Sequence, residues 1–178
     1  MPTNQQDAHD SIRSRFFLTW KDWVANGEPV DIRKPSGERK TPIVLLDSVL
    51  KQPYVLEVAF QNVERRNPND LSRHWCRLTI DPVDNRQRTF RTSDPSIGDG
   101  KARYTEQGVI IVQMFFSKSA FKGNDDRRLS VIARNIFRSR NVRGNEVWYR
   151  NADIRYLNPE ESWIRSNVIA EYEFDEII

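Results

Sequence analysis

Residues 109–116 of this 178-residue chain read VIIVQMFF, and apolar side chains occupy every position of this run except Gln113. Successive side chains of a β-strand point to opposite faces of a sheet, so a strand with one wet face alternates between apolar and polar residues. This run does not alternate. It therefore predicts a central strand, over 104–116, that is covered on both of its faces.

Two amphipathic segments are able to cover one face of that strand. In 9–25, apolar residues recur at helical spacing and Gly27 supplies a stop signal. In 125–139, a second apolar stripe starts from an acidic first turn and ends in an arginine-rich last turn, which suits the helix dipole. We therefore predict two helices on one face of the sheet, and only segment 27–53 or another subunit remains to cover the opposite face.

The remaining periodic segments predict strands. They are residues 54–60, 74–80, 146–157 and 163–177. Together with the central strand, their order predicts an α+β fold in a single domain over 1–178. Its sheet would be mixed, mostly antiparallel and of about five strands, with the two helices packed on one face.

Three segments have no clear periodicity. Residues 1–7 are polar and predict a flexible N-terminus. In 27–53, the sequence KPSGER predicts a hairpin turn, while VLLDSVLKQ could form a helical turn instead of a strand. Residues 81–103 carry Pro, Asp and Gly signals, and we predict a long functional loop there.

The composition excludes several classes of protein. A net charge of +3 is too small to identify a nucleic-acid binder. Only seven of the 28 basic residues are lysine, and the arginines favour bidentate pairing with carboxylates or phosphates. A single cysteine excludes an internal disulfide. The first ten residues lack the basic and apolar regions of a signal peptide, and no apolar run is long enough to span a membrane, so we expect neither.

Catalytic patterns are scarce in this chain. His74 and Cys76 share one face of a predicted strand, but two ligands do not make a zinc site, and His9 starts the first helix. The sequence has no nucleophile elbow, Walker loop or Rossmann glycine pattern. One fragment, Asp31 followed by Glu38 and Lys40, holds the residue types of a metal-dependent nuclease. We nevertheless expect no enzymatic activity, cofactor or metal.

The charges separate along the chain. Residues 122–143 carry seven basic side chains against two acidic ones, and residues 160–178 carry six acidic side chains against one basic. A head-to-tail ring would join two such different surfaces at each junction, whereas the alternative is that they pair within one subunit. The candidate interface residues are Arg127, Arg128, Arg134, Arg138, Glu171, Glu173 and Asp175.

The order of these pieces resembles a known family, the tail terminator proteins of long-tailed, non-contractile bacteriophages. After the first amphipathic helix the pieces are LEVAFQNVERRNPND, HWCRLTI, an Arg- and Thr-containing connection, GVIIVQMFF, RRLSVIARNIFRS, VWYRNADIRYL and WIRSNVIAEYEFDE. The similarity covers 54–176 and the first helix, while 27–53 departs from the compact pattern of the family.

The resemblance implies a structural virion protein with no catalytic residues. Such a protein forms a ring, typically a hexamer, at the head-proximal end of the tail tube. There it stops tube polymerisation and joins the tail to head-completion (neck) proteins, while DNA passes through without sequence-specific binding. The implied location is the virion, and the host cytoplasm before assembly.

The connection 81–103 would contact the tube or the neck in a tail terminator. The alternative is a basic nucleic-acid-binding module in which the same arginines meet phosphates. These residues are Arg86, Arg88, Arg91 and Arg103.

Overall fold

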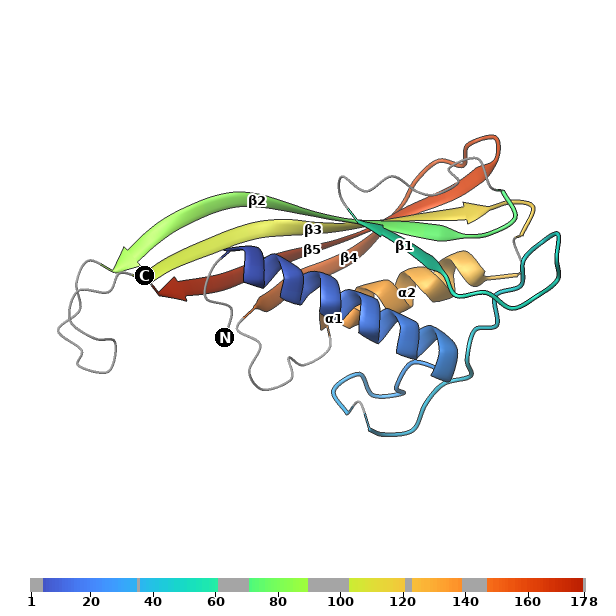
Figure 1. The fold of residues 1–178 in the computed structure, drawn as a ribbon, viewed down its shortest axis with the longest axis horizontal. Coiled ribbons are helices and arrows are strands. Elements are labelled where there is room, and N and C mark those ends of the chain that lie inside the picture. Colours follow the sequence, from blue (N-terminus) through green and yellow to red (C-terminus); the bar gives the residue numbers. More distant parts are fainter. Residues whose placement is uncertain are drawn as a thin grey trace.

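The computed structural model describes residues 5–34, 36–60, 71–89, 103–120, 123–138 and 147–177, without the side chains of 85–89, 103, 104, 176 and 177. They form one α+β domain, as predicted (Figure 1). The elements are α1 (Gln5–Asn26), β1 (Glu57–Phe60), β2 (Trp75–Thr89), β3 (Arg103–Ser117), α2 (Asp125–Arg138), β4 (Trp148–Tyr156) and β5 (Trp163–Ile177). The strand order is β1-β2-β3-β5-β4, and only β1 and β2 pair in parallel.

Strand β3 is the centre of this sheet, which confirms the prediction from its apolar run. Its side chains at Ile110, Val112, Met114 and Phe116 point to the helices and are fully buried. The side chains that alternate with these, from Val109 to Phe115, are only half-buried. Both helices lie on one face of the sheet (Figure 1), and we call the other side the open face. No helix in the described part of the chain covers the open face.

The helices begin and end for local reasons. Helix α1 ends at Asn26 because Gly27 adopts a left-handed φ of 87°, as the stop signal predicted. It begins at Gln5, so residues 5–7 of the segment that we predicted to be flexible are helical, and residues 1–4 lie outside the described chain. The early start follows from burial, since Ala8 is fully enclosed in the core. Helix α2 matches its prediction within one residue and packs against α1, β4 and β5.

The three longest strands project beyond the helices at one end of the molecule (Figure 1). Strand β2 continues to Thr89, so the prediction of a loop over 81–103 is wrong for 81–89 and for Arg103, while 90–102 lie outside the described residues. The extension was missed because it is polar and carries Pro82, followed by a register shift. Pairing with β3 forms this strand, and a bulge accommodates the proline.

Segment 27–56, which we call the strap, lies on the helix side of the sheet. Pro29 bridges Arg39 across the predicted hairpin turn, and the Lys51 N–H donates to the Asp47 carbonyl (3.0 Å) in the predicted helical turn. The strap buries Ile43 in the core formed with α1. The strap therefore does not cover the open face. Of the two covers that the sequence analysis named, segment 27–53 and another subunit, only the second remains. No described helix is long and apolar enough to cross a membrane.

Candidate subunit interface

The last strand divides its side chains between the two faces of the sheet, as its alternation predicted. Tyr172 and Phe174 point into the core and are 2% and 1% exposed. The acidic row, which we define as Glu171, Glu173 and Asp175, lies on the open face. Tertiary structure therefore places three carboxylates along one strand on this face, and Asp175 Oδ1 accepts a hydrogen bond from Thr105 Oγ1 (2.6 Å).

A pocket of about 310 Å³ lies beside the acidic row, and Val83, Gln107, Arg150, Glu171 and Glu173 line it together with neighbouring backbone. Glu173 Oε2 accepts a hydrogen bond from Gln107 Nε2 (2.8 Å) and lies 3.4 Å from a guanidinium nitrogen of Arg150. Val83 stands at the bulge of β2 and is 71% exposed. The pocket thus combines two carboxylates, one loosely held guanidinium and an exposed aliphatic rim.

The arginines of α2 lie on the opposite side of the sheet from the acidic row, because α2 packs on the core face of β4 and β5. Arg128 donates to the Thr41 carbonyl (3.2 Å), Arg134 to Asn135 Oδ1 (3.1 Å) and Arg138 Nε to the Ala152 carbonyl (3.0 Å). Arg127 is exposed and has no partner among the described residues. No ion pair in the described part of the chain joins this helix to the acidic row.

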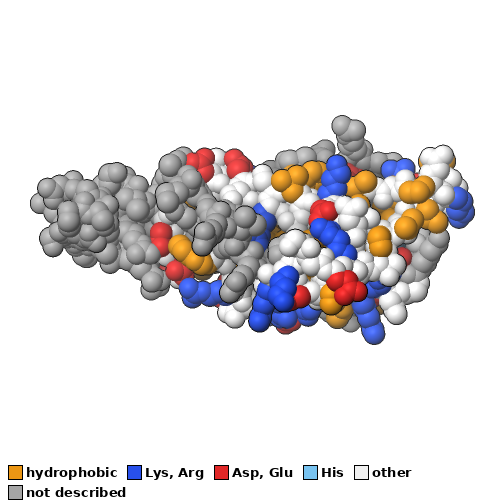
Figure 2. Space-filling view, turned by 90° about the horizontal axis from the view of Figure 1, so that it is seen from below, with side chains coloured by type: hydrophobic (Ala, Val, Ile, Leu, Met, Phe, Trp, Pro, Cys, Tyr) orange, Lys and Arg blue, Asp and Glu red, His pale blue; other side chains and the backbone are white. Residues whose placement is uncertain are grey.

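The surface on the helix side is mixed in charge. Figure 2 shows lysines and arginines interspersed with acidic and apolar side chains, and no single continuous basic patch among the coloured side chains. The predicted loop arginines are placed only in part. Arg86 and Arg88 lie in β2 and Arg103 in β3, with side chains that are not described, and Arg91 lies outside the described residues.

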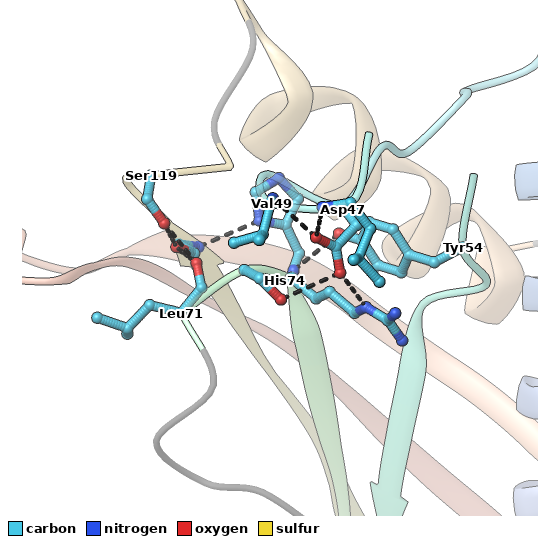
Figure 3. Close-up of polar contacts among 10 residues, drawn as sticks. Asp47, Val49, Tyr54, Leu71, His74 and Ser119 are labelled. Atoms are coloured by element: carbon cyan, nitrogen blue, oxygen red, sulfur yellow. Dashed lines mark hydrogen bonds and ion pairs between the residues drawn. The ribbon is translucent and has the colours of Figure 1, made fainter. Parts of the chain in front are cut away.

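The strap is fastened to the start of β2 through Asp47 (Figure 3). Its Oδ1 accepts the N–H groups of Val49 and Leu50 (both 2.8 Å), and its Oδ2 accepts Ser72 Oγ (3.1 Å) and Arg73 Nε (2.7 Å). The Leu50 N–H first, and then the Arg73 guanidinium, hold the pKa of Asp47 well below its usual range. The sequence DSVL indicates that Asp47 starts an Asx turn. No sequence pattern indicates that Arg73 pairs with Asp47.

His74 is a buried structural residue. It is 1% exposed, its ring Nδ1 accepts the backbone N–H of Ser117 (3.1 Å), and its backbone N–H donates to Tyr54 Oη (2.8 Å), as Figure 3 illustrates. Burial lowers the pKa of His74 from 6.5 to about 4. The ring is therefore neutral at pH 7 and serves as an acceptor at the junction of β2 and β3.

Stability should depend on the protonation of His74. The unfolded chain binds a proton at this ring below pH 6.5, whereas the folded chain resists it until about pH 4. The free energy of unfolding should therefore fall by about 3 kcal/mol as the pH drops through this window, at ~1.4 kcal/mol per unit of pKa. Urea titrations across this pH range measure the slope, and His74→Asn should flatten it.

The direct check uses His9→Gln, since the chain has two histidines and this variant leaves only His74. Its imidazole signal in NMR should remain that of the neutral ring down to pH values near 4. An ordinary titration near pH 6.5 would mean that the ring is not enclosed as described.

A second buried polar group joins α1 to the projecting strands. His9 Nε2 lies 3.2 Å from both Glu106 Oε1 and Tyr172 Oη, and Tyr172 Oη donates to Glu106 Oε1 (2.7 Å). Burial, and then the bond to Glu106, raises the pKa of Tyr172. Gly108 makes room for the tyrosine ring, because a Cβ there would lie 2.5 Å from it. Sequence reasoning missed Glu106, which no local pattern marks as buried.

The nuclease-like fragment does not assemble into a cluster. Lys40 Nζ pairs with Glu28 Oε2 (2.9 Å), Asp31 Oδ1 accepts the Arg33 N–H (3.0 Å), and Glu38 is exposed. Cys76 is fully buried, and burial raises the pKa of its thiol. Across the residues with described positions, no three His, Cys, Asp or Glu side chains are placed to hold a metal ion.

No protein-family model and no curated protein sequence matches this chain. One similar solved structure covers 93% of this chain and 94% of its own, at 15% sequence identity and a TM-score of 0.47.

Proposed function

We propose that this chain is a phage tail terminator, a structural protein without enzymatic activity. The observation that carries the proposal is the placement of the acidic row and the α2 arginines on opposite sides of one sheet. The acidic row and these arginines cannot pair with each other within one subunit in this arrangement. They are suited to a heterologous contact, and such contacts generate rings when the rotation between subunits closes.

The open face supports the same proposal. Strand β3 is apolar on both of its faces, but helices cover only one face. Val109 and Ile111, on the open face, are therefore half-buried. A neighbouring subunit would complete their burial, which stabilises a contact by about 25 cal/mol per Å² of apolar surface removed from water.

The proposed partners follow from the family that the sequence resembles. The ring, a hexamer, would sit at the head-proximal end of the tail tube in the virion, after assembly from subunits in the host cytoplasm. It would contact the tube protein and a head-completion protein, with DNA passing through and no sequence-specific binding. The projecting ends of β2 and β3, which carry Arg86 and Arg103, reach furthest from the helices and are the proposed contact (Figure 1).

The nucleic-acid-binding alternative is less well supported. Phosphates bind best where basic side chains gather, and the helix side mixes both signs of charge (Figure 2). The acidic row would repel phosphates from the open face.

The proposal predicts a specific effect on tail tubes. The purified protein, added to polymerising tube protein, should cap one end of each tube and shorten the mean tube length in electron micrographs. Native mass spectrometry should find a closed ring in the capped complexes, and DNA should survive incubation with Mg²⁺. Tubes of unchanged length with no bound subunit would refute the proposal, and cleavage lost in Glu38→Ala would favour a nuclease.

A further inference from the structure

The acidic row has unused hydrogen-bonding capacity at one place. Asn151, at a left-handed φ of 51° in the bulge of β4, donates from Nδ2 to Glu171 Oε2 (2.8 Å). Gln107 and Arg150 engage only Oε2 of Glu173. The Oε1 atoms of Glu171 and Glu173 accept no hydrogen bond from any described residue. Glu171 and Glu173 are two positions apart on β5, so their Cα atoms are separated by about 7 Å along the strand.

The pocket beside these two carboxylates can admit one more cation. Its only described cation is Arg150, which is 62% exposed and 3.4 Å from Glu173. Two carboxylates against one guanidinium leave one negative charge, so a second guanidinium would neutralise the pocket. Arginine suits this role better than lysine, because its planar fork can give parallel hydrogen bonds to carboxylate oxygens.

The helix layer offers one matching donor among the four predicted arginines of α2. Arg128, Arg134 and Arg138 already donate within the chain. Arg127 is exposed and has no acceptor in the part of the chain that the structure describes. It also stands on the side of the sheet opposite to the pocket, so it can reach such a pocket only on another copy.

We propose that the open face docks a second copy of this chain, with Arg127 of one copy entering the pocket of Glu171 and Glu173 on the next. Arg150 stays beside Glu173 Oε2, and the incoming guanidinium takes the Oε1 atoms that accept no hydrogen bond from a described residue. The exposed Val83 at the rim packs against the aliphatic part of the arriving side chain. This inference deepens the proposed function, since it names the contact that would join neighbouring subunits of the ring.

Charge exchange between two separately tagged proteins tests the contact. Arg127→Glu should weaken association by about tenfold or more, because it places like charges together. The same should hold for Glu171→Arg with Glu173→Arg. Mixing the two variants should restore association between them and not within either. Arg33→Glu, an equal charge change on an exposed strap residue, should leave association unchanged and is the matched control.

A separate variant tests the role of Arg150, which stays in the pocket and lowers its negative charge. Arg150→Gln removes the resident cation while leaving both carboxylates, so association should become several-fold tighter and more sensitive to salt. Weaker association of this variant would mean that Arg150 itself makes the contact, and would overturn its assigned role. Circular dichroism should show all variants folded, since each changed side chain lies at the surface or the pocket rim.

Association should be measured by sedimentation in free solution and by counting subunits on capped tube ends. If Arg127→Glu and Arg33→Glu associate equally well in both settings, or if no self-association occurs in either, the pocket contact is wrong. Tubes capped by an Arg127→Glu ring would leave the terminator function intact. Copies that associate through the pocket but leave tubes uncapped would instead refute the terminator function alone.

Discussion

Met114→Asp is expected to abolish folding. Met114 is fully buried, and its strand pairs with β2 at Cys76 and with β5 at Ser166. A carboxylate there enters a dry core between the sheet and the helices, with no described cation placed to receive it. The cost of several kcal/mol is a large part of the stability of an ordinary domain. Circular dichroism and size-exclusion chromatography of the purified variant would measure the loss.

Phe115→Asp is the matched control, one residue away on the open face. Phe115 is half-buried and stacks on Trp75 at a centroid separation of 4.0 Å. Its loss should cost about 1–3 kcal/mol from stacking and apolar contact, with the subunit still folded. A folded Met114→Asp beside an unfolded Phe115→Asp would mean that the two faces are assigned the wrong way round.

Gly27→Ala is expected to lower the free energy of unfolding by about 2–5 kcal/mol. At a φ of 87° an alanine is strained, and its Cβ would also lie 1.9 Å from the Lys40 carbonyl oxygen. That carbonyl belongs to the strap backbone, which the Lys40 N–H ties to the Glu28 carbonyl (2.8 Å), so it cannot move without breaking this turn. Urea denaturation would measure the change.

Gly37→Ala provides the comparison within the same strap. Gly37 needs no left-handed φ, and its added Cβ would lie 3.2 Å from the Lys34 carbonyl oxygen at an exposed turn. We expect a change below about 1 kcal/mol. Equal losses for the two variants would show that the end of α1 does not depend on the close approach of the strap.

The sequence by itself determined the features that depend on local periodicity. The stripe of α1, its stop at Gly27 and the alternation of β5 that separates Glu171 from Tyr172 were all readable. The reason is that side-chain direction repeats every 3.6 residues in a helix and every two in a strand. The central place of β3 followed as well, because a strand that is apolar on both parities is poorly suited to an edge.

Only the tertiary structure decided how these pieces meet. Pairing with β3 makes a strand of the polar residues 81–89, and packing on α1 places the strap on the helix side, so the strap does not cover the open face. The burial of Glu106 and the meeting of Asp47 with Arg73 join residues that are distant in sequence. Such contacts depend on how strands and helices pack, which local patterning does not encode. For the same reason, only the fold placed the α2 arginines and the acidic row on opposite sides of one sheet.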